Sequence, residues 1–401
     1  MASAETAHVI LQLFVVFAGA KVMGGLAHLV RVPSLVGELV AGILLANTFL
    51  GPALGVSADL ELLRVLAELG VIFLLFIVGL ETPFEEMRKV GGTSTAVAVL
   101  GVVVPFVAGY LLMHAYGAPT VQALFLGAAL VATSVGITAR VLSELGVLGG
   151  REARIIIGAA VIDDVLGLTI LTVVEAVGSG GPLEPWRIGF LLLQALLFVG
   201  LLMYFGGRLT RRVLSEANPI ARRYAWASPN GALYTIAIVV CLGLSVLAAS
   251  VGLAAIIGAF LAGMAFAASD KRHDLLERFE GIVRFLTPFF FGYIGLQVQL
   301  AAALDAWQLA LIVTAIALVT KVVACGLGAI RLGRPSALAV GIGMMPRGEV
   351  GIIVALIGLS LNVIPDSLYA VVVAMSIGTT VLTPPLLVWA FRRLPGPTRA
   401  A

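Results

Sequence analysis

The segment ARIIIGAAVIDDVLGLTILTVVEAVG, residues 153–178, decides the fold class of this 401-residue chain. It is apolar over a length that, at about 1.5 Å of rise per residue, crosses a hydrocarbon core of about 30 Å. Two adjacent acids, Asp163 and Asp164, interrupt it near its middle. A charged side chain at mid-bilayer costs about 2.5 to 3.5 kcal/mol on insertion scales, so the pair requires an explanation.

The composition of the whole chain is also that of a membrane protein. Hydrophobic residues make up 60% of it and charged residues only 12%, whereas soluble domains carry about 25% charged residues. The net charge of +3 is explained below by membrane topology, so we expect no nucleic-acid partner. Cys241 and Cys325 lie in apolar segments without a CxxC or Cys/His spacing, and we expect no disulfide, zinc or other cofactor.

Thirteen apolar segments predict thirteen transmembrane helices and an all-α membrane protein surrounded by lipid. They lie at about 7–29, 34–54, 63–82, 93–115, 119–143, 153–178, 187–212, 229–249, 251–268, 279–299, 305–332, 336–359 and 366–392. The linkers between them are too short to hold a folded unit, so we expect no soluble regulatory domain in the chain.

The basic residues give an orientation. Twenty of the 25 Lys and Arg residues fall in the loops and tail on one side of the thirteen predicted spans, and only Arg64 and Arg187 fall in the loops on the other. By the positive-inside rule the basic side is cytoplasmic, which puts the N-terminus outside and the C-terminus inside. The three remaining cations, Lys21, Lys321 and Arg347, fall within predicted spans.

The chain repeats itself weakly. Three short matches recur in the same order at offsets of 215 to 221 residues: 37–42 with 258–263, 79–80 with 295–296, and 134–137 with 349–352. They predict two six-helix units, spans 1–6 and 8–13, joined by span 7. Because the units are offset by seven spans, an odd number, they are inverted relative to each other, which is the plan of many secondary transporters.

Two predicted spans are interrupted at corresponding places in the two units. The fifth contains ATSVGIT at 132–138, and the twelfth contains GMMPRGEVG at 343–351. Such breaks predict crossed, discontinuous helices whose ends frame a binding site, with a simple packing kink as the alternative. Thr133 could supply an oxygen to a cation. The residues expected to form the breaks or balance charge at the helix ends are Ser134, Gly136, Pro346, Arg347 and Glu349.

The two acids of the sixth span face different surroundings, since neighbouring residues on a helix point about 100° apart. One interpretation is a structural ion pair beside a protonated acid. The other is a site at which a proton and a hard cation compete for one carboxylate, which is the physical basis of antiport. Lys321 lies deep in the eleventh span and needs a carboxylate, either Asp163 or Asp164. Snorkelling to the interface and a retinal Schiff base are the alternatives for this lysine.

These motifs together resemble bacterial sodium/proton antiporters of the NapA type, within the cation/proton antiporter superfamily and its NhaA-like fold. The resemblance covers nearly the whole chain and is carried by ATSVGITAR at 132–140, VIDDVLGL at 161–168, Lys321 and PRGEVG at 346–351. It implies that Asp164 transiently binds the transported Na⁺ or Li⁺, and that Asp163 pairs with Lys321. Because both acids are present, it also implies electrogenic exchange, and thus a transporter rather than an enzyme.

The resemblance further implies a homodimer in a bacterial inner membrane, with an elevator-like mechanism and a role in pH homeostasis. It assigns the dimerisation domain to residues 1–90 and 229–302, which hold spans 1–3 and 8–10. It assigns the core transport domain to residues 91–182 and 303–401, which hold spans 4–6 and 11–13. Residues 183–228 then form the linker helix, span 7.

Other classes fit the sequence less well. A potassium/proton exchanger or efflux system of the same superfamily usually carries a nucleotide-binding domain and a Gln in the acidic motif. An intramembrane aspartyl protease takes its two acids from separate helices, one of them within a GxGD motif, which differs from the adjacent Asp163 and Asp164. An organic-anion symporter of similar fold has less reason to keep Lys321 opposite an acid pair.

Overall fold

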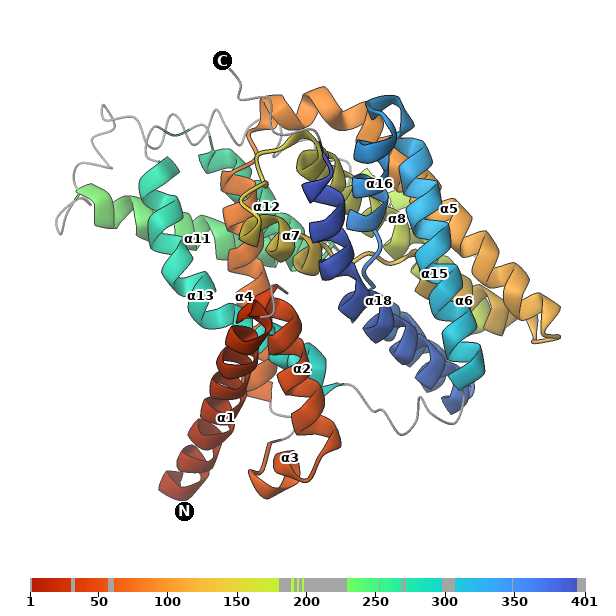
Figure 1. Ribbon diagram of the computed structural model, residues 1–401, viewed down its shortest axis with the longest axis horizontal. Helices are drawn as coiled ribbons and strands as arrows, with labels where there is room; N and C mark the ends of the chain where they lie inside the picture. The colour runs from red at the N-terminus through yellow and green to blue at the C-terminus, as the bar shows by residue number, and fades with distance from the viewer. Residues whose placement is uncertain are drawn as a thin grey trace.

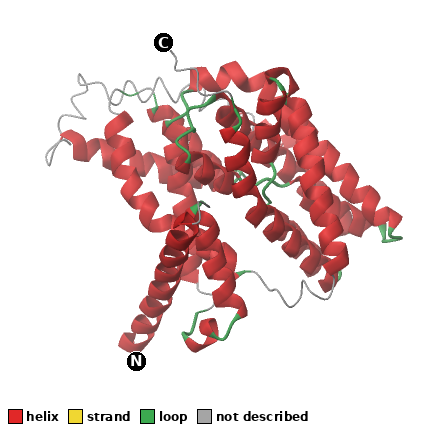
Figure 2. Ribbon diagram, viewed as in Figure 1, coloured by secondary structure: helices red, strands yellow, loops and turns green. Residues whose placement is uncertain are grey.

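The computed structural model describes residues 2–29, 33–56, 61–179, 229–251, 253–267, 272–297, 307–347 and 349–394, together with Ser269 and isolated positions between 189 and 197. Within these ranges the regular structure is entirely helical, and no strand occurs (Figure 2). The all-α fold predicted from the sequence is therefore confirmed for the described part of the chain.

The first helix group is built around α4 (Glu61–Leu80) and α13 (Arg272–Leu296), which pack against each other. Around them lie α1 (Ala2–Leu29), α2 (Ser34–Asn47), the short α3 (Leu50–Ala53), α11 (Pro229–Ser250) and α12 (Ala255–Phe266). In Figure 1 this group occupies the left and lower left of the view.

The second helix group is built around α5 (Phe84–Ala115) and α15 (Trp307–Gly328), which also pack on each other. It further contains α6 (Thr120–Val131), α8 (Arg151–Gly178), the 3₁₀ turn η1 (Ile330–Leu332), α16 (Arg334–Gly343), α17 (Glu349–Ser360) and α18 (Asp366–Arg392). It lies to the right in Figure 1.

Helix α7 (Val135–Glu144) joins the two groups. It packs on α8 and α18 of the second group and on α2 and α4 of the first. At its end, Glu144 Oε2 accepts a hydrogen bond of 3.2 Å from the backbone N–H of Ser34, the first residue of α2. Glu144 Oε1 also lies 3.0 Å from Arg140 Nε. A polar contact therefore links the groups at this end of α7.

Twelve of the thirteen predicted spans overlap a helix of the structure. Nine helices in the described residues are long and apolar enough to cross a membrane, and three shorter apolar helices accompany them. The seventh predicted span, 187–212, lies almost entirely outside the described residues, so the total of thirteen stays a prediction.

Several predicted boundaries were wrong by a few turns. The fourth span was expected to begin at 93, yet α5 begins at Phe84, because the helix continues through charged residues that an apolar criterion excludes. For the same reason α13 begins at Arg272 rather than 279. The ninth span was expected over 251–268, but Ala254 is extended and α12 comprises only 12 residues, or about 18 Å.

Close glycine contacts within the first group occur twice in equivalent form. A Cβ atom on Gly42 of α2 would overlap the backbone of α13, where Gly295 Cα would lie 2.8 Å away. A Cβ atom on Gly263 of α12 would overlap the backbone of α4, where Gly79 Cα would lie 2.9 Å away. Gly42 corresponds to Gly263 and Gly79 to Gly295 in the internal sequence match, so the two helix pairs pack in the same way.

Candidate functional site

Two interrupted helices meet inside the second group. Residues 132–134 are non-helical between α6 and α7, and residues 344–347 are non-helical after α16, ahead of α17. The N–H of Ser134 donates to the carbonyl of Pro346 at 2.8 Å, and Thr138 Oγ1 donates to the Gly343 carbonyl at 2.7 Å. The two breaks therefore contact each other directly, although they lie about 200 residues apart in the sequence.

The break before α17 is caused locally and is held by a neighbouring helix. Pro346 lacks an N–H group, and its ring disfavours a helical conformation for the preceding residue. Two hydroxyls of α18 form hydrogen bonds with the backbone N–H and carbonyl of Arg347, the residue after Pro346. Thr379 Oγ1 accepts from the N–H of Arg347 at 3.0 Å, and Thr380 Oγ1 donates to the carbonyl of Arg347 at 2.8 Å. Sequence reasoning missed both threonines, because adjacent Thr residues in an apolar helix give no signal of their own.

The side chain of Arg347 is fully buried beside the break. Its guanidinium lies 3.4 Å from the carbonyl oxygens of Met344 and Met345, which follow α16, and 3.4 Å from the Ala317 carbonyl of α15. A cation at the C-terminal end of a helix is favoured by the helix dipole. Arg347 thus lies at the end of α16, where the sequence predicts that it balances charge; that role stays a prediction. Glu349 opens α17, but its side chain lies outside the part that the structure describes.

Lys321 and Asp163 form a buried ion pair. Lys321 Nζ lies 2.9 Å from Asp163 Oδ1, and both side chains are 0% exposed. The ammonium also donates to the carbonyl oxygens of Gly101 in α5 and Val131 at the end of α6, each at 2.8 Å. An ammonium has three N–H donors, and all three are used here. This full set of partners offsets part of the large desolvation cost of burying the ammonium.

The two acids differ in their surroundings. Asp163 Oδ2 is buried and has no hydrogen-bond partner. Asp164, one residue further along α8, is partly exposed. Adjacent positions on the helix thus place one carboxyl against Lys321 in the interior and the other at a partly exposed position. The oxygen of Asp163 that accepts no hydrogen bond is a position at which a proton can be added.

The break residues contribute in unequal ways. Thr133 is buried, and its Oγ1 lies 3.5 Å from the Met344 carbonyl, at the limit of a hydrogen bond. Its oxygen is therefore held only weakly. Gly136 was expected in the break but lies in the first turn of α7. A Cβ atom there would be 2.9 Å from Val71 Cγ2 and 3.3 Å from the ring of Phe290, so this glycine serves packing instead.

A small cavity lies between the two helix groups next to this site. It measures about 20 Å³, and it is lined by Leu39, Ile294, Gln297, Arg347, Ile352, Val373, Ser376, Ile377 and Thr380. Arg347 Nε and Ser376 Oγ are buried without hydrogen-bond partners. A volume of this size holds about one water molecule.

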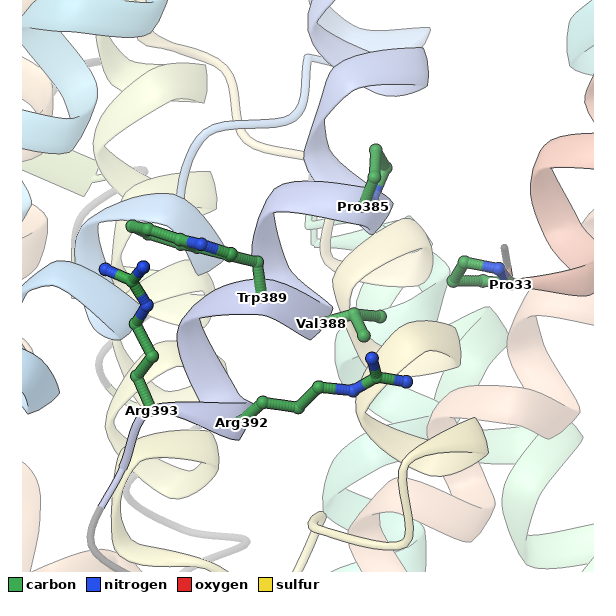
Figure 3. Close-up of a pocket in the computed structure, with 6 residues that line it drawn as sticks. All are labelled: Pro33, Pro385, Val388, Trp389, Arg392 and Arg393. Atoms are coloured by element: carbon green, nitrogen blue, oxygen red, sulfur yellow. The ribbon is translucent and has the colours of Figure 1, made fainter. Parts of the chain in front are cut away.

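A larger cavity of about 310 Å³ lies at the end of α18, lined by Pro33, Pro385, Val388, Trp389, Arg392 and Arg393. The Arg393 guanidinium lies over the Trp389 ring, 4.0 Å from its centroid. Figure 3 shows Arg393 beside Trp389, while Arg392 extends toward the opposite side of α18. This cavity shares no lining residue with the ion pair. Among the described residues no group of three or more His, Cys, Asp or Glu could hold a metal ion.

Comparisons with known proteins agree with a transporter. The family model described as "Sodium/hydrogen exchanger, transmembrane" matches residues 13–393. The chain is 36% identical to the high-affinity Na(+)/H(+) antiporter NhaS3 of Synechocystis, over 95% of this chain and 89% of that protein. It is 32% identical to the Na(+)/H(+)-K(+) antiporter GerN of Bacillus cereus, over 95% of each.

The fold also has a solved counterpart. The sodium proton antiporter MjNhaP1 of Methanocaldococcus jannaschii superposes with a TM-score of 0.70, covering 96% of this chain and 97% of that one. The two sequences are only 16% identical. The likeness therefore concerns the fold.

Proposed function

Because this chain belongs to the transmembrane sodium/hydrogen exchanger family, we propose that it exchanges Na⁺ or Li⁺ for protons across the membrane, with Asp164 as the group that carries the ion. The observation that carries the proposal is that the two adjacent acids have different surroundings. Asp163 is held by Lys321 in the interior, whereas Asp164 is partly exposed one residue further on.

Competition at one carboxylate would couple the two ions. The Asp164 carboxylate can either take a proton or, with further oxygen ligands, hold a hard cation such as Na⁺. Thr133 is the proposed source of a second oxygen, since its hydroxyl is held only by a long contact to the Met344 carbonyl. A bound cation excludes the proton and a bound proton excludes the cation, so each ion releases the other.

Electrogenic exchange requires a second proton for each sodium ion. One proton replacing one Na⁺ at Asp164 moves no net charge. The Asp163–Lys321 pair is the proposed source of the second proton, because Asp163 Oδ2 is buried without a hydrogen-bond partner beside the ammonium. This would make the acid pair, rather than Asp164 alone, the source of the current.

Alternating access would come from movement of the two helix groups. We assign the first group to the dimerisation domain and the second to the core transport domain, with α7 packed between them. The equivalent glycine contacts of α2 with α13 and of α12 with α4 support the inverted repeat. Exposed apolar residues along α1, such as Phe14 and Val22, suit contact with lipid or with a second copy of the chain.

Potassium is the second candidate ion, because the relative GerN is named a Na(+)/H(+)-K(+) antiporter. An aspartyl protease fits less well, since Asp163 is engaged by Lys321 rather than free to share a water with another acid.

Proteoliposomes would decide between the ions. Current on a solid-supported membrane would be recorded after jumps of Na⁺, Li⁺ and K⁺ at equal ionic strength, with Asp164→Asn as the control. We expect currents with Na⁺ and Li⁺ that the substitution abolishes. A response to K⁺ alone would favour the second candidate, and no response to any of the three would refute cation exchange.

A further inference from the structure

Both backbone acceptors of Lys321 come from irregular helices. In a continuous α-helix the carbonyl of residue 101 accepts a hydrogen bond from the N–H of residue 105. Residue 105 is a buried proline within α5, so this bond cannot form. The Gly101 carbonyl instead accepts from Lys321 Nζ at 2.8 Å. Because residue 105 is a proline, the Gly101 carbonyl receives no hydrogen bond from that residue and is available to Lys321.

The second acceptor has a parallel origin. Val131 is the last residue of α6, and the break at residues 132–134 interrupts the helix immediately after it. Its carbonyl accepts from Lys321 at 2.8 Å. Freed backbone groups in a membrane must find another partner, because lipid offers none. Two interruptions in different helices thus point their unused carbonyls at one ammonium.

We propose that Pro105 is a positioning residue for Lys321: it withholds an N–H group from the Gly101 carbonyl and so reserves that oxygen for the ammonium. The role rests on the proposed function in so far as Lys321 and Asp163 take part in ion exchange. With two carbonyl acceptors in place, the ammonium stays fixed when Asp163 takes up a proton.

The packing around Gly101 fits this role. A Cβ atom at this position would lie 2.6 Å from Cys325 Sγ and 3.5 Å from Lys321 Nζ. The absence of a side chain lets α15 approach α5 closely enough for the lysine to reach the carbonyl. A proline ring also clashes with the carbonyl four residues before it, which favours bending of the helix at this point.

Pro288 in α13 provides a matched control. It is also a buried proline within a long helix, and it withholds an N–H from the carbonyl of Arg284 in the same way. It lies in the first helix group, where α13 packs on α4 and α2. A general effect of helix bending would appear equally in Pro105→Ala and Pro288→Ala, whereas the positioning role belongs to Pro105 only.

A double-mutant cycle of melting temperatures, called the thermal cycle below, tests the proposal without measuring transport. Pro105→Ala and Pro288→Ala would each be placed in the native chain and in an Asp163→Asn/Lys321→Met background that lacks the buried charges. We expect Pro105→Ala to lower the melting temperature of the native chain, because the restored N–H of residue 105 competes with Lys321 for the Gly101 carbonyl. In the variant without the buried charges there is no such competition, and the restored helix hydrogen bond should raise the melting temperature. Pro288→Ala should act alike in both. The same change for Pro105→Ala in both backgrounds would overturn the proposal.

The pH profile of exchange gives a second readout. The charged and titratable groups that act on Lys321 are Asp163 on α8, Arg347 in the break after α16, and Cys325 one turn along α15. Loss of one acceptor destabilises the ammonium, so activity of Pro105→Ala should fall off at lower pH than in the native protein, by about one unit. The profile of Pro288→Ala should not move.

The two readouts separate the possible failures. If the native protein shows no cation-driven proton movement, the proposed exchange function fails while the thermal cycle still decides the role of Pro105. If the native protein transports and the profiles of the two proline variants coincide, the positioning role is wrong and the exchange function stands.

Discussion

Replacing Lys321 by methionine removes the ammonium that holds Asp163 while keeping an unbranched side chain of similar length. Both side chains are 0% exposed, and Nζ donates to Asp163 Oδ1 at 2.9 Å. Removing one partner of a buried ion pair costs about 3 to 5 kcal/mol, because the other charge is left uncompensated. We expect Lys321→Met to lower the free energy of unfolding by about this amount at neutral pH.

Proton uptake limits that cost and makes it depend on pH. An ordinary aspartic acid, with a pKa of about 3.9, becomes neutral at a cost of about 4 kcal/mol at pH 7 and about 1.5 kcal/mol at pH 5. A carboxylate that has lost its cation can take this route. The stability deficit of Lys321→Met should therefore be largest at alkaline pH and shrink as the pH falls.

Melting curves in detergent from about pH 5 to about pH 8 would measure this dependence, with Asp163→Asn/Lys321→Met as the control. The double variant carries neither charge, so it should regain part of the stability at high pH and lose the pH dependence of the deficit. The reasoning would be refuted by a single variant whose deficit is equal at both ends of the range, or by a double variant no more stable than the single one.

Four other variants address the neighbouring elements. Asp164→Asn should reduce sodium-driven proton movement to the level of protein-free liposomes, and a normal rate would exclude Asp164 as the carrier. Thr133→Val should raise the KM for sodium more than it lowers the maximal rate, and an unchanged KM would exclude Thr133 as a ligand. Thr380→Val should lower the melting temperature through the loss of one buried hydrogen bond, worth about 1 kcal/mol; an unaltered melting curve would show that the break does not need it. Cysteines at Ser34 and Glu144, joined by a short cleavable cross-linker, should stop exchange until the linker is cut, whereas exchange through the linked protein would show that α2 and α7 need not separate.

The interrupted helices could be predicted because proline acts on its own neighbours. Pro346 has no N–H and disfavours a helical conformation for Met345, and with Gly343 and Gly348 close to it the sequence predicts a break here, whereas Pro105 and Pro288 lie within continuous helices. The same reasoning misplaced Gly136, which lies within α7. A glycine can mark a break or a close contact, and the contact with Val71 and Phe290 exists only after the helices have packed.

The residues that hydrogen-bond to the site could not be predicted, because only tertiary packing brings them next to it and no sequence motif marks them. Thr379 and Thr380 lie in an apolar helix, and only the packing of α18 on α16 and α17 brings their hydroxyls to the break. Gly101 contributes a backbone oxygen, which no side-chain motif records. Pro105 is visible in the sequence, but its meaning depends on a lysine more than 200 residues away.

A buried lysine needs more hydrogen-bond acceptors than a single carboxylate oxygen provides. The ammonium has three donors, and Asp163 accepts from one of them. The other two donors bond to carbonyls at interruptions of the helix hydrogen bonding, that of Gly101 opposite Pro105 and that of Val131 at the end of α6. One of these interruptions, after Val131, also contains Thr133 and contacts the break at Pro346. If a cation binds near Asp164 as proposed, a shift of this break would move an acceptor of Lys321 and so connect the proposed cation site to the ion pair through the backbone.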